Sequence, residues 1–129
     1  MLRRSGAIVV AACAFAAAAA AVAGEADVEK VRIAKERAGT YRFHVTVRHG
    51  DTGWKHYADK WDVVAPGGKV LGTRVLVHPH ETEQPFTRSL SGVRIPRGVA
   101  RVTVRAHDKV HGYGGKVVTL AVPRDGEGS

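Results

Sequence analysis

Hydrophobic and polar residues alternate with a period of two along most of the chain after residue 28. Over residues 41–48 the sequence YRFHVTVR places aromatic and β-branched residues at the odd positions and polar residues at the even positions. This alternation is typical of a strand with one face in a core and the other in solvent. The same region shows no helical period, so the pattern predicts an all-β domain.

Turn signals divide this pattern into short segments. Ala38-Gly39, Pro66-Gly67-Gly68 and Pro96-Arg97-Gly98 are typical turn sequences, because proline fixes φ and glycine accepts positive φ. The predicted strands cover residues 30–35, 41–48, 57–64, 70–77, 86–90 (with an extension to 95), 101–106 and 116–122. Seven such strands favour a seven-stranded antiparallel β-sandwich of the immunoglobulin or fibronectin type III kind. A small closed β-barrel is the alternative. In either case the strand residue Trp61 is expected in the core.

The N-terminal segment has a different composition and predicts export. Arg3 and Arg4 precede an apolar, alanine-rich run over residues 6–22, and Ala21-Val22-Ala23 is a small-x-small cleavage sequence. These are the parts of a secretory signal peptide cleaved after Ala23. The expected organisation is therefore a signal peptide (1–23), a β-sandwich domain (24–123) and a polar C-terminal tail (124–129). The mature protein is expected in the periplasm or outside the cell, without a stable membrane anchor.

Two other interpretations of the N-terminal segment remain open. The apolar run is about long enough to span a bilayer uncleaved. Val10-Ala11-Ala12-Cys13 also loosely fits a lipobox, although the apolar stretch before Cys13 is short and apolar sequence follows it. Cys13 is the single cysteine of the chain, so a domain cleaved after Ala23 has no disulfide and no thiolate ligand.

The net positive charge of the chain indicates which classes of molecule it could bind. The 129 residues include 20 Lys and Arg against 12 Asp and Glu, a formal net charge of +8, and removal of residues 1–23 leaves +6. A composition of 44% hydrophobic and 25% charged residues is ordinary for one globular domain. Export argues against nucleic acid as the partner, while anionic polymers of the cell envelope fit a basic surface. The sequence leaves the oligomeric state open.

Histidines gather in three connections that are longer than a hairpin needs. These connections cover residues 49–56, 78–85 and 107–115, and they contain six of the seven histidines. They follow the second, fourth and sixth predicted strands, so all three open at the same end of a sandwich. Imidazoles without thiolates suit Zn(II), Cu(II) or Ni(II). The sequence therefore predicts a Cu(II) or Zn(II) site built from some of His49, His56, His78, His80, His107 and His111.

Strand parity complicates this metal site. His78 and His80 flank Pro79, which favours an extended backbone with both rings on one side, and they are the best pair. His107 and His111 come next, with Asp108 or Glu81 as acceptors that could fix a tautomer. However, alternation places His49 on the inward face and His107 on the outward face. The six histidines therefore form either one site or two groups.

A binding module without metal is the second hypothesis. Trp54, Tyr57 and Tyr113 could form an aromatic surface beside Lys55, Lys109 and Lys116, suited to anionic envelope glycans or a partner protein. Catalysis has little support, because no G-x-S-x-G elbow or comparable nucleophile context is present. We therefore expect a binding protein and not an enzyme.

Three loop segments resemble those of an uncharacterised family of small exported bacterial β-sandwich proteins. They are Asp51-Thr52-Gly53-Trp54, His78-Pro79-His80 with Glu83-Gln84-Pro85-Phe86, and Val110-His111-Gly112-Tyr113-Gly114-Gly115. The resemblance covers nearly the whole predicted domain and implies no activity, ligand or catalytic residue. At the level of fold the chain also resembles fibronectin type III and immunoglobulin-like domains, without their Cys…Trp…Cys pattern. That fold hosts many functions and does not discriminate among them.

Overall fold

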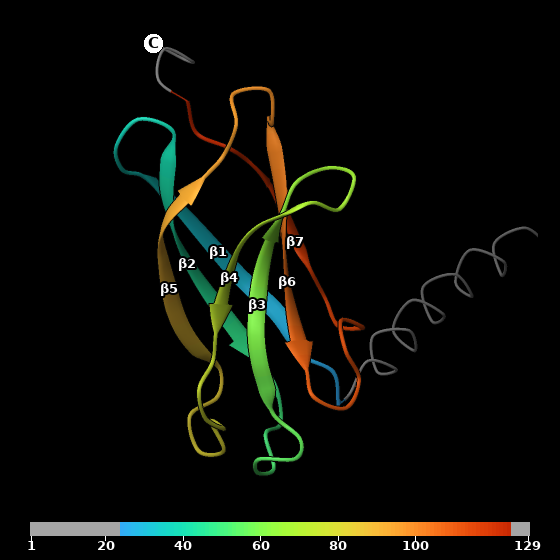
Figure 1. The fold of residues 1–129 in the computed structure, drawn as a ribbon. Helices are drawn as coiled ribbons and strands as arrows, with labels where there is room; N and C mark the ends of the chain where they lie inside the picture. Colours follow the sequence, from blue (N-terminus) through green and yellow to red (C-terminus); the bar gives the residue numbers. More distant parts are fainter. Residues whose placement is uncertain (1–23, 125–129) are drawn as a thin grey trace, which may run out of the picture.

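Residues 24–124 form two antiparallel sheets packed face to face in a computed structural model that describes this range (Figure 1). The strands are β1 (Asp27–Lys35), β2 (Thr40–Arg48), β3 (Ala58–Val64), β4 (Val70–Val75), β5 (Phe86–Arg94), β6 (Arg101–Asp108) and β7 (Val118–Ala121). One sheet has the order β1-β2-β5 and the other the order β4-β3-β6-β7. The predicted seven-stranded sandwich is confirmed. The closed-barrel alternative is wrong for the described residues, because their strands form two separate sheets.

The predicted signal peptide (1–23) and residues 125–129 of the predicted tail lie outside the described residues. Between residues 24 and 124, no helix has the length and apolar character that crossing a membrane requires.

The strands agree with the alternation in number and order, but several boundaries differ. β1 begins at Asp27 instead of residue 30, and β6 ends at Asp108 instead of residue 106. β5 continues to Arg94, so the longer version of the fifth strand is right, whereas β4 ends at Val75 instead of residue 77. β7 is shorter than the predicted 116–122 because Lys116 pairs with the start of β1 instead. The Lys116 amide donates to the Asp27 carboxylate, and the Lys116 carbonyl accepts a hydrogen bond from the Val28 amide.

Alternate positions of the strands fill the space between the sheets. In β2 and β6 every second residue is buried, which is the pattern that a half-buried strand requires. Trp61 is the largest fully buried side chain, so its predicted place in the core is confirmed. Tyr41, Phe43, Phe86 and Ile95 are buried with it. Burial of a side chain of this size stabilises the fold by roughly 1.5–3 kcal/mol.

The two sheets approach each other closely where β4 passes β5. A Cβ atom on Gly72 would lie 3.2 Å from methyl carbons of both Leu90 and Val93. Glycine at this position therefore lets the β4 backbone rest on β5 side chains. The Arg74 guanidinium strengthens the same edge by donating to the Ser89 carbonyl.

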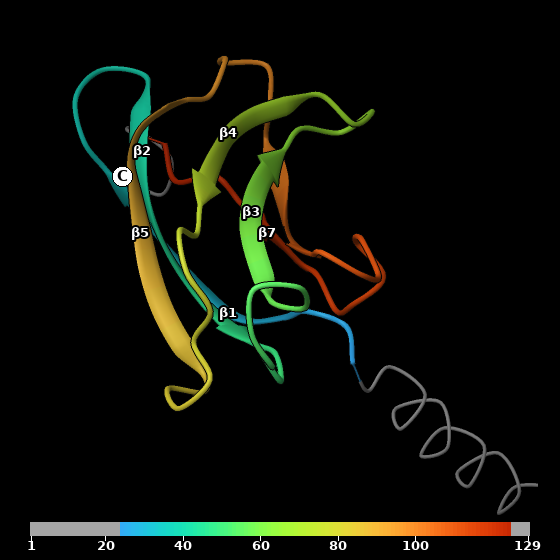
Figure 2. The same cartoon turned by 60° about the horizontal axis from the view of Figure 1, so that its bottom comes forward.

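The β2–β3, β4–β5 and β6–β7 loops meet at one end of the sandwich, as the strand count predicts. Figure 2 brings this end forward. The His49 amide in the first loop donates to the Gln84 side chain in the second over 2.8 Å. The Lys109 amide in the third donates to the Tyr57 carbonyl in the first over 3.1 Å. The loops therefore pack as one unit, which we call the histidine end.

Candidate metal centre

Asp108 lies at the centre of the histidine end. Val102, Val104 and Ala106 point into the core from β6, and Asp108 is the next residue on the same face of the strand. Its side chain has no solvent exposure. A buried carboxylate is costly unless it is hydrogen-bonded, so its partners are essential to the fold.

Three imidazoles surround one oxygen of this carboxylate. Oδ2 of Asp108 lies 2.8 Å from Nε2 of His49, 2.9 Å from Nδ1 of His111 and 3.1 Å from Nε2 of His56. His49 and His56 belong to the β2–β3 loop, whereas His111 belongs to the β6–β7 loop. The rings also contact each other, with centroids 4.8 Å apart for His49 and His56 and 5.1 Å apart for His56 and His111. We call His49, His56, Asp108 and His111 the Asp108 cluster.

The second oxygen of Asp108 is held by backbone. Oδ1 accepts hydrogen bonds from the amides of Val110 and His111. Burial would raise the pKa of Asp108, but the hydrogen bonds from His111, Val110 and His49 outweigh it and hold that pKa far below its usual range. The carboxylate is therefore ionised and fixed in orientation.

A second buried carboxylate orients His49. Asp51 Oδ1 accepts a hydrogen bond from Nδ1 of His49 and another from the Ala58 amide, while Oδ2 accepts one from the His80 amide. The side chains of Asp51 and His49 have no solvent exposure. A carboxylate on one ring nitrogen is a common means of fixing the tautomer of a metal-binding histidine. Here it directs Nε2 of His49 toward Asp108.

The resulting donor set has the dimensions of a metal site. One ligand atom from each of His49, His56 and Asp108 lies within 4.8 Å of the other two. The side chains of His56 and His111 are 26% and 37% exposed, so the cluster opens to solvent on their side. Two or three imidazoles and one carboxylate form a set that Zn(II) and Cu(II) accept. The cluster could therefore hold such an ion.

His78 and His80 form a separate pair beside Asp51. Their rings lie 4.6 Å apart, and the His80 ring stacks on Phe86 at 3.9 Å. Nδ1 of His80 lies 3.9 Å from Oδ2 of Asp51. Burial and the positive charge of Arg88 lower the pKa of His80. The structure thus brings together the two histidines that flank Pro79. They lie next to Asp51, which orients His49, and not around Asp108.

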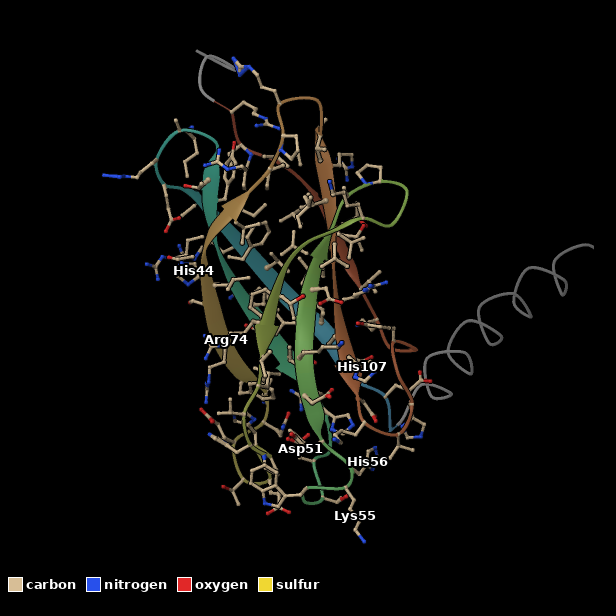
Figure 3. The ribbon with its side chains drawn as sticks, viewed as in Figure 1. His44, Asp51, Lys55, His56, Arg74 and His107 are labelled. Carbon is tan, nitrogen blue, oxygen red and sulfur yellow. The ribbon has the colours of Figure 1, made fainter. Side chains whose placement is uncertain are left out.

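His107 lies on the outer face of its sheet, away from the cluster (Figure 3). Its Nδ1 is 2.6 Å from Oδ1 of Asp59, and its ring is 4.8 Å from that of Tyr113. Strand parity explains the separation, because consecutive residues of β6 point to opposite faces and Asp108 takes the inward one.

The predicted aromatic residues occupy two places. Trp54 is 64% exposed and packs edge-on against Tyr57, with ring centroids 5.6 Å apart. Tyr57 is buried, and Nζ of Lys109 lies 5.9 Å from its centroid. Tyr113 instead donates to Asp62 and packs under Arg105, whose Cζ is 4.0 Å from the ring centroid. Trp54 and Tyr57 form one contact, while Tyr113 belongs to the outer face of the sheet.

Gly24, the first described residue, lies against the Asp108 cluster. A Cβ atom on Gly24 would be 3.4 Å from Cε1 of His111. The hydrogen bond with Asp108 raises the pKa of His111, and desolvation partly opposes this increase. The negative charges of Asp108 and Glu25 and a hydrogen bond with the Gly24 backbone also raise that pKa. The start of the described domain is thus part of the surroundings of the site.

The central role of Asp108 and the anchoring role of Asp51 go beyond the sequence analysis, which names Asp108 only as a possible acceptor for a histidine and gives Asp51 no role. The alternation of inward and outward residues could have identified both aspartates. Inward positions of β2 continue through Val47 to His49 and then to Asp51, and those of β6 continue through Ala106 to Asp108. Extending each strand by one or two inward positions therefore finds the buried polar residues.

Comparison with known proteins shows a similarity to a protein named as a lipoprotein over most of this chain. A protein of Halomicrobium mukohataei named "Putative lipoprotein" is 42% identical to this chain over 96 residues, which are 74% of the chain and 47% of that protein. The chain thus spans about half the length of this relative. No protein-family model matches the chain, and no solved structure matches it.

Proposed function

We propose that this protein is an exported metal-binding protein whose histidine end binds Zn(II) or Cu(II) through His49, His56 and Asp108. The observation that supports this proposal is the approach of three ligand atoms, two of them fully buried, to within 4.8 Å of one another. His111 is the fourth group, since its ring contacts the same carboxylate oxygen.

The hydrogen bonds of the cluster support this proposal. Nε2 of His49 and Nε2 of His56 both point at Oδ2 of Asp108, so the two nitrogens and the oxygen already share one centre. An ion bound there would be held by Nε2 of His49, Nε2 of His56 and the Asp108 carboxylate, and its binding would release the protons that the two imidazole nitrogens share with Asp108. Asp51 would continue to orient His49 through Nδ1, because its carboxylate is not one of these ligand groups.

The donor set selects the class of metal. Imidazole nitrogen with a single carboxylate oxygen suits borderline ions such as Zn(II) and Cu(II), whereas Mg(II) and Ca(II) prefer oxygen ligands. Binding, transport or buffering of the ion fits this site better than catalysis, because two of its three ligand groups, His49 and Asp108, are fully buried.

Export is supported by two independent observations. The N-terminal sequence has the parts of a signal peptide, and the Halomicrobium relative is named as a lipoprotein. We place the domain in the cell envelope, in the periplasm or on the outer surface. The Cys13 sequence offers lipid attachment as the alternative to cleavage after Ala23.

Calorimetric titration of the metal-free domain with Zn(II) and with Cu(II) tests the proposal. We expect one ion per chain, and a loss of affinity of about tenfold or more in His49→Gln and in His56→Gln. His107→Gln is the matched control, because His107 is a half-buried histidine bonded to an aspartate outside the cluster. Absence of binding, or an equal loss in the control, would refute the proposal.

An interaction surface for anionic envelope glycans is the second candidate function. The exposed Trp54 favours this function, since it packs on Tyr57, and the Lys109 ammonium lies over the Tyr57 ring. Binding of such a polymer should decrease in Trp54→Ala and should weaken with salt where Lys55 and Lys109 contribute. If Trp54→Ala binds envelope glycans as the wild type does, this second function is excluded.

A further inference from the structure

A basic surface covers the outer side of the β1-β2-β5 sheet, and we call it the basic face. Alternate residues of these strands point away from the core, and basic side chains recur among them. The basic residues of the face are Lys30, Arg32, Arg42, Arg48 and Arg94. Figure 3 shows His44, near the middle of this face, well separated from Asp51 and His56 at the histidine end. The basic face is therefore distinct from the Asp108 cluster.

Strand pairing arranges the basic face in rows. Arg32 on β1 lies opposite His44 on β2, and His44 lies opposite Ser89 on β5. Lys30 lies opposite Thr46 in the next row. Neighbouring strands are roughly 4.8 Å apart, and alternate residues of one strand are roughly 6.8 Å apart. Long cationic side chains thus stand beside short hydroxyl-bearing ones on a flat surface.

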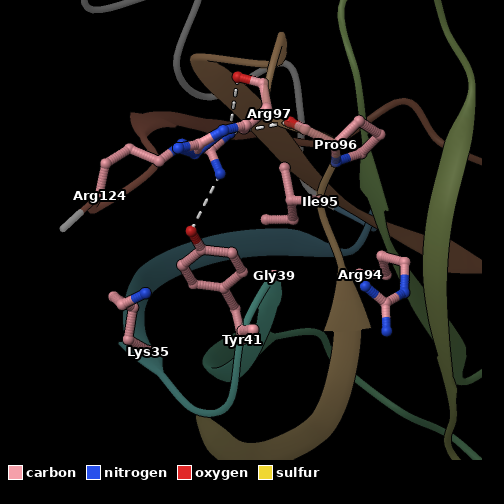
Figure 4. A pocket seen from close by; sticks show the side chains of 9 residues that line it. Lys35, Gly39, Tyr41, Arg94, Ile95, Pro96, Arg97 and Arg124 are labelled. Atoms are coloured by element: carbon pink, nitrogen blue, oxygen red, sulfur yellow. Dashed lines mark hydrogen bonds between the residues drawn. The ribbon is translucent and has the colours of Figure 1, made fainter.

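Arg94 extends the basic face to the β1–β2 turn. It lies opposite Thr40, and a Cβ atom on Gly39 would be 3.1 Å from its Nη1. Figure 4 shows Arg94 at the end of β5, apart from the Tyr41 ring and the Arg124 guanidinium. Its charge therefore belongs to the outer surface of the sheet.

Two of the five cations have an acidic partner. Nε of Arg48 lies 2.6 Å from Oε2 of Glu29, and Nε of Arg42 lies 3.5 Å from Oε2 of Glu36. The other cations of the face form no ion pair within residues 24–124, and they are Lys30, Arg32 and Arg94. The basic face therefore keeps an excess of positive charge.

His44 responds to this positive charge. Partial burial and the positive charges of Arg32 and Arg42 lower the pKa of His44. Its Nδ1 lies 2.8 Å from the Ser89 hydroxyl, so the ring is held flat against the sheet by a neutral group. The charges that act on His44 come from β1 and from its own strand, and both are positive.

The central cations on the outer face of the other sheet are compensated by acids of that sheet. Nε of Arg105 lies 3.2 Å from Oδ2 of Asp62, and Nδ1 of His107 lies 2.6 Å from Oδ1 of Asp59. The Tyr113 hydroxyl also donates to Asp62. The uncompensated cations of β1 are therefore a feature of one face and not of both.

The basic face also differs from a surface that inserts into lipid or stacks on neutral sugars. Within residues 24–124 the large hydrophobic side chains that are exposed lie on other parts of the molecule, and they are Trp54, Val70, Val75, Val77, Val110 and Val117. A flat array of cations and hydroxyl groups instead matches an extended chain with regularly placed anionic groups. Guanidinium groups suit carboxylates because their planar donors bind both oxygens.

We propose that the basic face binds an acidic polysaccharide of the cell envelope whose charges are carboxylate groups. Lys30 and Arg32 pair with its carboxylates, while Thr46 and Ser89 exchange hydrogen bonds with its hydroxyl groups. The inference rests on the export that the proposed function includes, and it is independent of the metal centre. It also places the polymer on the side of the sandwich, whereas Trp54 lies at the histidine end.

Oligogalacturonate is a suitable probe because it is a linear chain of carboxylate-bearing sugars. Calorimetry with the metal-free protein should detect its binding, which should weaken as salt is added. The fully methyl-esterified oligomer has the same backbone without charge and should not bind. In nuclear magnetic resonance titrations the bound polymer should raise the pKa of His44, because carboxylates beside Arg32 and Arg42 offset the charges that lower it. Absence of binding, or equal binding of the ester, would overturn the proposal.

Paired substitutions test the position of the polymer. An exposed charge pair contributes up to about fivefold, so Lys30→Gln with Arg32→Gln should weaken binding about tenfold. Lys69→Gln with Arg101→Gln is the matched control, because it removes one exposed lysine and one exposed arginine from the other sheet. Trp54→Ala should bind as the wild type does. An equal loss in the control, or a loss confined to Trp54→Ala, would contradict the proposal.

Zn(II) titration of the same variants separates this inference from the proposed metal centre. Lys30→Gln with Arg32→Gln should bind Zn(II) as the wild type does, and His49→Gln should bind oligogalacturonate as the wild type does. Loss of oligogalacturonate binding in His49→Gln would place the polymer at the histidine end and overturn the proposal.

Discussion

Nε2 of His49 lies 2.8 Å from Oδ2 of Asp108, although 59 positions separate the two residues in the sequence. Each residue is the first polar side chain on the inward face of its strand, His49 after β2 and Asp108 at the end of β6. The contact therefore joins the two sheets at the point where the apolar core ends. It is both a structural link and the basis of the candidate metal centre.

Asp108→Asn should weaken the fold as well as metal binding. The change removes a buried charge on which three imidazoles converge, and breaking such an interaction on one side costs about 3 kcal/mol. Urea denaturation should show this decrease in the free energy of unfolding, and Zn(II) titration should show the loss of affinity. Asp59→Asn is the control, because it removes the partner of His107 on the outer face. Equal effects of the two substitutions would mean that the position of Asp108 in the cluster has no special role.

Gly115→Ala should destabilise the domain more than Gly114→Ala. A Cβ atom on Gly115 would overlap the backbone carbonyl of Ala26, which cannot move without shifting the start of β1. On Gly114 it would meet only the carboxylate end of the Glu25 side chain, which can rotate away. We expect a loss of about 1–3 kcal/mol for Gly115→Ala by urea denaturation. The reverse order would show that the loop does not pack on β1 in this way.

The acid sensitivity of the fold should depend on Asp62. Burial would raise the pKa of Asp62, but hydrogen bonds from Thr73, Tyr113 and Arg105 outweigh it and hold that pKa below its usual value. A depressed pKa stabilises the folded state above the unfolded pKa, and this contribution is lost as pH falls through the folded pKa. The free energy of unfolding should therefore decrease below about pH 5, and less steeply in Asp62→Asn. Parallel pH profiles for the two proteins would contradict this expectation.

The two tryptophans should differ in fluorescence. Trp61 is fully buried and Trp54 is 64% exposed. In Trp54→Phe, emission from Trp61 alone should be shifted to the blue and should resist quenching by acrylamide, while Trp61→Phe should show the opposite behaviour. Trp61→Ala should also lower the free energy of unfolding by about 3–5 kcal/mol, whereas Trp54→Ala should change it little. Equal quenching of the two single-tryptophan variants would be inconsistent with the fold.

Local pattern was sufficient for the fold because each strand shows its buried face through alternation. The run from Tyr41 to Val47 predicts β2 closely, and Trp61 is placed correctly in the core. β7 was harder, since its length depends on the pairing of Lys116 with β1, which is a contact between distant segments. Tertiary contacts between distant segments determine where strands end, and a short sequence pattern carries no information about such contacts.

The site was only partly predictable for the same reason. Strand order correctly brings three loops to one end, and parity separates His49 from His107. The position of His56 depends on the path of a loop that follows no periodic pattern. The role of Asp108 depends on the inward faces of β2 and β6 ending opposite each other, and this is set by how the two sheets pack together.

The contact between Gly24 and His111 ties the site to the way the protein is made. Cleavage after Ala23 would convert the Gly24 nitrogen from an amide into an amino group that titrates near neutral pH, at about 7.7–8.0. The exported domain would then have a free amino group on the residue that lies against His111, which its precursor lacks. A chain processed at Cys13 would keep the amide at this position. The place of cleavage would therefore decide whether a titratable amino group or a neutral amide belongs to the residue beside His111.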